Sequence, residues 1–133
     1  MSAETPVKNP ETQAERLEMS RRFAVEAARL ASNTRCHSVM VLDMAGVSPV
    51  TDFYVIATGT SARQMRTVCD QVDELSEKMG LKSYRRSGYE GESWIAVDYV
   101  DVVLHVFSAD ARTYYDLENL WGDAKRVAWE EGK

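Results

Sequence analysis

The segment Trp94–Phe107, WIAVDYVDVVLHVF, places the strongest constraint on how this 133-residue chain can fold. On both sides of Tyr99-Val100, aliphatic residues occupy every second position, which is typical of two strands in a hairpin. We therefore expect strands at Trp94–Asp98 and Asp101–Phe107. Alternation places their aliphatic side chains on one face of the sheet, and this face must be core.

The expected register also sorts the polar and aromatic side chains of the hairpin. A turn at Tyr99-Val100 puts Ile95 opposite Leu104 and Val97 opposite Val102, and on the other face Trp94 opposite His105, Ala96 opposite Val103 and Asp98 opposite Asp101. His105 then lies roughly 13 Å from Asp101 along its strand, so the two side chains cannot share a proton or a metal. This separation argues against a catalytic cluster.

Two interpretations remain open for each of these side chains. His105 is either a packed, hydrogen-bonded histidine or a ligand. Asp98 and Asp101 either cap the turn or face a partner. Trp94 either fills the core or, beside two acids, anchors an interface with a charged rim.

The rest of the chain predicts an α+β domain. Apolar periodicity indicates helices over Thr12–Ser32, from Ser61 to a stop at Gly80, and from Ser108 or Asp110, together with strands at Ser38–Met44, Asp52–Gly59 and around Lys82–Arg85. The last helix should turn Tyr114, Leu117 and Trp121 inward, and a further helical turn or two should cover Asp123–Glu130. The order α-β-β-α-β-β-β-α favours a mixed sheet flanked by helices, in one domain over residues 12–133. Residues 1–11 are expected to form a disordered tail.

The charge and composition of the chain limit the kinds of partner that it can bind. The formal net charge is -5, and no long basic run is present, so direct binding to DNA or RNA phosphates is disfavoured and a basic protein partner suits the chain better.

No apolar run approaches the ~18 residues of a membrane span, and no signal peptide is recognisable. Cys36 and Cys69 form neither a CxxC pair nor a disulfide framework, and Cys69 falls on an apolar helix stripe, as a buried thiol in a reducing cytoplasm would.

Motifs of enzymes and cofactor sites are weak or absent. ATGTSARQ, Ala57–Gln64, is a strand–glycine–helix turn with a capping-box pattern at Ser61 and Gln64. It lacks the lysine and spacing of a P-loop, and the chain contains no GxGxxG, GxSxG or HExxH. With only His37 and His105 available, a histidine-based metal site is not expected. We therefore predict no enzyme activity, no cofactor and no metal.

Four blocks in order resemble the ribosomal silencing factor, or Iojap, family. They are VLDM at Val41–Met44, TDFYVIATGTSARQ at Thr51–Gln64, EGESWIAVDYVDVVLHVF at Glu90–Phe107 and RTYYDLENLWGDA at Arg112–Ala124. Any one block is weak, but four in the correct order are specific. The similarity runs from about Leu17 to Ala124.

The resemblance implies a protein that is not an enzyme. Similar proteins bind protein fourteen of the large ribosomal subunit, on the face that meets the small subunit, and so block subunit joining and repress translation in the cytoplasm. A minor contact with ribosomal RNA and a homodimer are further partners to consider. The partner-binding candidates are Glu90, Trp94, Asp98, Tyr99, Asp101 and His105.

The resemblance also supplies the enzymatic alternative, because the family fold is related to that of nucleotidyltransferases. Those enzymes, or nucleotide-binding proteins like them, use Gly-Ser at a helix start and an Asp-x-Asp pair. Here Gly59 precedes Thr60-Ser61, but no Asp-x-Asp follows. One departure from the family concerns the hairpin, since Val100 stands where the family usually has glycine. A two-residue turn there favours positive φ, which a β-branched residue resists.

Overall fold

The computed structural model describes residues 12–81, 83–116, 119 and 122–130. Its elements, in chain order, are α1 (Gln13–Asn33), β1 (His37–Asp43), β2 (Phe53–Thr58), α2 (Ala62–Lys78), β3 (Arg85–Ser87), β4 (Trp94–Asp98), β5 (Val102–Phe107), α3 (Ala109–Tyr115) and β6 (Lys125–Val127). The six strands form one sheet in the order β3-β4-β5-β2-β1-β6. Only the β2–β5 pair is parallel. The predicted mixed α+β architecture is therefore confirmed, while the relation to nucleotidyltransferases stays a prediction.

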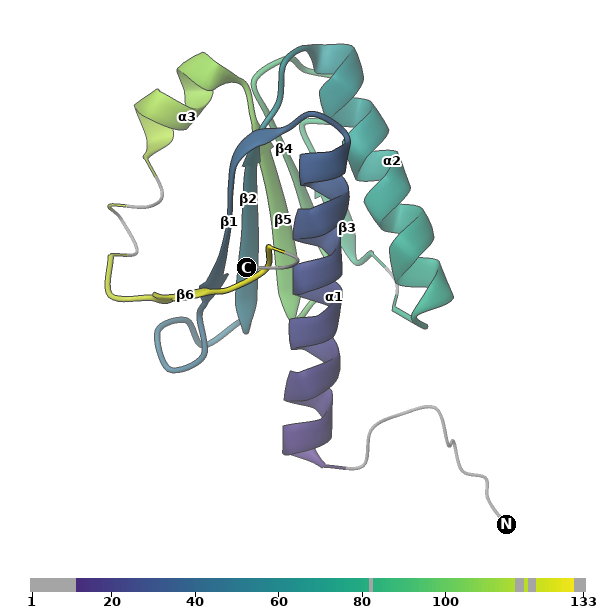
Figure 1. Cartoon of the computed structure of the whole chain (residues 1–133), viewed down its shortest axis with the longest axis vertical. Helices are drawn as coiled ribbons and strands as arrows, with labels where there is room; N and C mark the ends of the chain where they lie inside the picture. The colour runs from purple at the N-terminus through teal and green to yellow at the C-terminus, as the bar shows by residue number, and fades with distance from the viewer. Residues whose placement is uncertain (1–11, 82, 117–118, 120–121, 131–133) are drawn as a thin grey trace.

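The two long helices cover the same face of the sheet and lie side by side (Figure 1). α1 begins one residue after its predicted start, because Thr12 and Glu15 form a capping box in which each side chain accepts the other residue's backbone N–H, at 3.0 and 3.2 Å. Its buried face contains Phe23 and four alanines, whose small side chains allow close approach to the sheet: Ala24, Ala27, Ala28 and Ala31.

α2 buries the apolar stripe that its periodicity predicts, with Met65, Val68, Cys69 and Val72 in the main core. Its start is capped by Ser61, whose Oγ accepts the N–H of Gln64 at 3.1 Å. The side chain of Gln64 accepts the N–H of Thr60 and not that of Ser61. The predicted capping box is therefore only half formed.

The hairpin of β4 and β5 has the predicted faces but a different register. Trp94 pairs with Phe107, Ala96 with His105, Val97 with Leu104 and Asp98 with Val103, so the partners are displaced by two residues from the expected ones. The predicted Trp94–His105 and Asp98–Asp101 pairs are thus wrong. Because a shift of two residues preserves alternation, Ile95 and Val97 still point into the core beneath the helices.

The turn itself explains the shift. The N–H of Asp101 donates to the carbonyl of Tyr99 at 2.9 Å, which makes a γ-turn centred on Val100, and the N–H of Tyr99 donates to Val102 at 2.8 Å. Val100 has φ of 75°, the left-handed region that strains a β-branched residue. Four residues, 99–102, therefore separate the paired Asp98 and Val103 where two were expected, and this shifts the register by two residues.

Replacing Val100 by glycine is expected to stabilise the domain by about 1 kcal/mol, because the left-handed strain outweighs the backbone entropy that glycine adds to the unfolded chain. Val100 is 54% exposed, so its side chain contributes little packing. Urea unfolding at an unchanged m-value would show the gain as a higher midpoint. Val50→Gly is the matched control, since Val50 is also exposed but does not have positive φ. A midpoint that falls in Val100→Gly contradicts the strain.

The predictions for the C-terminal part of the chain are only partly correct. α3 starts after its cap Ser108, as expected, but ends at Tyr115, and the following cap residue Asp116 adopts a left-handed conformation. Tyr114 is 81% exposed and does not turn inward, because this short helix presents Ala111 and Arg112 to the sheet. Leu117 and Trp121 lie outside the described residues, as does the predicted tail over residues 1–11.

The helix expected at Asp123–Glu130 is wrong, because Lys125–Val127 forms β6 on the edge of β1. Pairing with β1 satisfies backbone groups that an edge strand would otherwise expose, and it packs Val127 against the main core.

The short strand β3 lies at Arg85–Ser87, later in the chain than the expected Lys82–Arg85. None of the described helices is long and apolar enough to cross a membrane.

Candidate functional site

The two faces of the sheet are covered to different degrees. α1 and α2 pack on one face over the main core. On the other face the described residues include a smaller buried cluster, to which α3 contributes Ala111. Five side chains of β2, β4 and β5 on this second face are only half-buried, and we call the surface they form the open face: Tyr54, Trp94, Ala96, Asp98 and Val103.

An aromatic cluster lies at the α3 end of the open face. The Trp94 ring stacks on Phe107 with centroids 4.9 Å apart, and it contacts Tyr115 of α3 at 4.6 Å. Tyr115 is 44% exposed and contacts the more exposed Tyr114. Tyrosine and tryptophan are enriched at protein interfaces, because they provide large contact areas at low entropic cost. The cluster therefore has the composition of an interface anchor.

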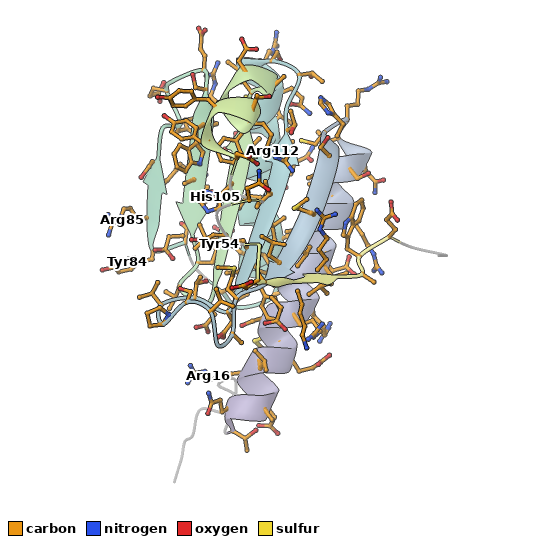
Figure 2. The ribbon with its side chains drawn as sticks, turned by 90° about the vertical axis from the view of Figure 1, so that its left-hand side faces the viewer. Arg16, Tyr54, Tyr84, Arg85, His105 and Arg112 are labelled. Atoms are coloured by element: carbon orange, nitrogen blue, oxygen red, sulfur yellow. The ribbon has the colours of Figure 1, made fainter. Side chains whose placement is uncertain are left out.

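His105 lies on the same side of the sheet but is buried, with 7% of its surface exposed. Its Nδ1 accepts the indole N–H of Trp94 at 3.0 Å, and its ring makes an edge contact with Tyr54 at 4.7 Å. Figure 2 shows His105 and Tyr54 on this side, with Arg112 of α3 above them. Burial lowers the pKa of His105 to about 4, so the ring is neutral near pH 7. The structure thus places His105 as a packed, hydrogen-bonded histidine.

The predicted acids lie at other parts of the hairpin. Asp98 ends β4 on the open face, and its Oδ1 accepts the N–H of Val100 at 2.7 Å. Asp101 is half-buried in the turn, and its backbone carbonyl accepts the N–H groups of Asp52 and Phe53. Glu90 is exposed in the loop between β3 and β4. Trp94 and Asp98 therefore share a face at opposite ends of one strand, roughly 13 Å apart.

Negative charge gathers around the turn end of the sheet. The pKa of the Asp52 carboxyl is raised by partial burial and then by Asp101 and Asp43, against an opposing effect of Arg16. Burial raises the pKa of the Tyr54 hydroxyl, and the negative charge of Asp98 raises it further. Asp52, Asp98 and Asp101 thus bring negative charge to this end of the open face, where Arg85 of β3 lies opposite Asp98, and the excess of carboxylates suits a basic partner.

Tyr99 is not on the open face. Its ring is 3% exposed and packs edge-on against Phe23, while its hydroxyl donates to Asp73 of α2. Burial and this hydrogen bond raise the pKa of Tyr99 well above its usual value. Arg86 of β3 also donates to Asp73, so this carboxylate joins α2 to both the hairpin turn and the sheet edge.

Sequence reasoning missed Tyr54 and Tyr115 as members of this surface. Alternation along Asp52–Gly59 could have identified Tyr54, since Tyr54 and Ile56 point to the face opposite Phe53 and Val55. Tyr115 had no such signal, because its place depends on where α3 ends. Val50, 76% exposed near the acidic end, was also missed.

The described residues contain no group of three or more His, Cys, Asp and Glu side chains that could hold a metal ion. At the strand–glycine–helix turn, Gly59 lies directly against Met65, so a Cβ at this position would come within 2.3 Å of the Met65 Cγ.

Cys36 and Cys69 are free and buried, as predicted for Cys69, and burial raises the pKa of Cys69 to about 12. These thiols are therefore protonated and unreactive near neutral pH.

Comparison with known proteins gives a consistent result. Residues 17–133 match the family model described as "Ribosomal silencing factor during starvation". A ribosomal silencing factor of Bacillus subtilis is 37% identical over 98 residues, which are 74% of this chain and 83% of that protein. One from Halalkalibacterium halodurans is 36% identical over 104 residues, 78% of this chain and 89% of that protein.

Solved structures and a plant relative extend the comparison. A crystal structure from Bacillus halodurans superposes with a TM-score of 0.67 at 33% identity, covering 81% of this chain and 95% of that one. One from Chromobacterium violaceum gives 0.72 at 28% identity, covering 87% and 93%. The chloroplastic Iojap protein of Arabidopsis thaliana is 32% identical over 92% of this chain, which spans 51% of that longer protein. The chain therefore belongs to the ribosomal silencing factor family.

Proposed function

We propose that this protein represses translation by binding the large ribosomal subunit and keeping the small subunit from joining it. Its docking surface is the open face, and its partner is protein fourteen on the intersubunit side of the large subunit. The observation that carries the proposal is the half-buried aromatic cluster around Trp94 on a sheet face that α3 covers only at one end. Family membership supplies the ribosome as the partner.

Charge supports a basic protein as the binding partner. The chain has a formal net charge of -5, and the carboxylates Asp52, Asp98 and Asp101 lie around one end of the open face. Acidic groups at the rim of an interface steer a basic partner into place and set the register of binding. The central contact is Trp94, since a few aromatic residues carry most of the energy of an interface.

The proposed mechanism is steric and needs no chemistry. A folded chain of this length has a radius of gyration of about 14 Å, so it fills space that the small subunit needs on the joining surface. The proposed place of action is the cytoplasm, and activity as an enzyme is not part of the proposal. Contact with ribosomal RNA and pairing of two copies remain predictions.

The protein is expected to co-sediment with isolated large subunits and not with small ones. Sucrose-gradient sedimentation of the purified chain with each subunit at physiological salt measures this directly. The variant Glu74→Ala, which removes an exposed acid from α2 on the helix-covered side, should sediment like the unmodified protein. Equal binding to both subunits, or to neither, contradicts the proposed function.

A further inference from the structure

The hydrogen bond between Trp94 and His105 determines which imidazole nitrogen carries the proton. Nδ1 of His105 accepts the Trp94 indole N–H at 3.0 Å, so it has no hydrogen of its own. The neutral ring is therefore protonated on Nε2. Among the residues that the structure describes, this Nε2 has no hydrogen-bond partner although it is buried.

An unpaired buried N–H destabilises a folded protein, because the group loses its water and gains nothing in return. A leucine of similar size would fill the same space among Tyr54, Phe107 and Trp94 without that cost. The Nε2–H therefore gives a histidine no advantage in stability over leucine at this position. What the histidine provides and leucine does not is an acceptor for the Trp94 indole.

The other contacts of the Trp94 ring are less directional. Phe107 stacks on the ring, and Tyr115 packs against it at a tilt. Aromatic contacts of this kind tolerate rotation and sliding, whereas a hydrogen bond to Nδ1 fixes where the indole N–H points. The bond also occupies the only donor that the indole has.

We propose that His105 is a positioning residue that orients the Trp94 indole for docking, so that the partner meets Trp94 through its ring and not through its N–H. This inference rests on the proposed function, since it concerns the same open face. The partner group that contacts Trp94 is then apolar or cationic and lies over the indole ring, and the partner supplies no hydrogen-bond acceptor for the indole N–H.

Two substitutions separate positioning from a structural role. His105→Leu removes the unpaired N–H but also leaves the Trp94 indole N–H without its acceptor, so its stability should stay close to that of the unmodified protein. Its binding to large subunits should weaken roughly fivefold, the value of one lost hydrogen bond. His105→Asn keeps an acceptor oxygen near the position of Nδ1 and adds a buried amide. It should be less stable yet bind close to normally.

Proton NMR of the indole N–H groups gives a measurement that does not depend on the ribosome. The Trp94 signal is assigned by its absence in Trp94→Phe. It should move and exchange faster with water in His105→Leu, and stay near its original position in His105→Asn.

The outcomes are distinct. An unchanged Trp94 signal in His105→Leu, failure of His105→Leu to fold, or binding that follows stability in both variants overturns the positioning role. If the unmodified protein does not bind large subunits, the proposed function fails, and the NMR comparison still decides whether His105 orients Trp94.

Discussion

Replacing Trp94 by alanine is expected to weaken binding to the large ribosomal subunit more than tenfold while the domain remains folded. An aromatic residue at the centre of an interface typically contributes over ~2 kcal/mol, which is more than a factor of ten in affinity. The ring of Trp94 packs on the smaller cluster with Phe107 and Tyr115, outside the main core. Its loss should therefore cost less stability than the roughly 3–5 kcal/mol of a fully buried aromatic side chain.

The matched control for this experiment is Trp129→Ala. Trp129 packs on the main core on the α1 side, where its backbone carbonyl accepts the side-chain Nε–H of Arg29 at 2.8 Å, and it is remote from the open face. Sedimentation with large subunits, after circular dichroism has shown both variants to be folded, should give a loss for Trp94→Ala alone. Normal binding by a folded Trp94→Ala protein would rule out the open face as the docking surface.

Acidification is expected to destabilise the protein by roughly 3 kcal/mol between pH 7 and pH 4 through His105 alone. The folded-state pKa of this histidine is lowered by burial to about 4, from 6.5 for a free side chain. Between these values the unfolded chain binds a proton at His105 that the folded protein does not. The free energy of unfolding therefore falls as the pH falls from about 6.5 towards 4.

Urea unfolding of the unmodified protein and of His105→Leu at a series of pH values isolates this contribution. The raised pKa of Asp52 acts in the opposite direction, since the folded state holds its proton more tightly, but it is present in both proteins. The stability difference between the two proteins should therefore grow by roughly 3 kcal/mol as the pH is lowered from 7 to 4. Parallel pH profiles would mean that His105 is accessible to water in the folded state.

Features that depend on neighbouring residues could be predicted from the sequence. The start of α1 follows from the capping pair Thr12 and Glu15, and the buried stripe of α2 follows from helical spacing. The alternation that places Ile95 and Val97 in the core also places Trp94 on the other face, and the structure confirms both. The face of the sheet on which Trp94 lies could therefore be predicted from the local pattern, while its role in binding stays a proposal.

Features that depend on distant residues were not predicted. Asp73 of α2 holds Tyr99 beneath the helix, and four residues instead of two separate the paired Asp98 and Val103, so the register differs by two residues and Tyr99 lies away from the other candidate residues. Lys125–Val127 is a strand because β1 offers it an edge, although its local sequence suggested a helix.

The sequence by itself therefore determined the family, the mixed α+β class and the parity of the two hairpin strands, because side-chain alternation and helix capping are properties of consecutive residues. The tertiary structure decided the register, the edge strand and the burial of His105. These depend on hydrogen bonds and packing between segments far apart in the chain, such as Asp73 with Tyr99 and β6 with β1, which no local pattern encodes.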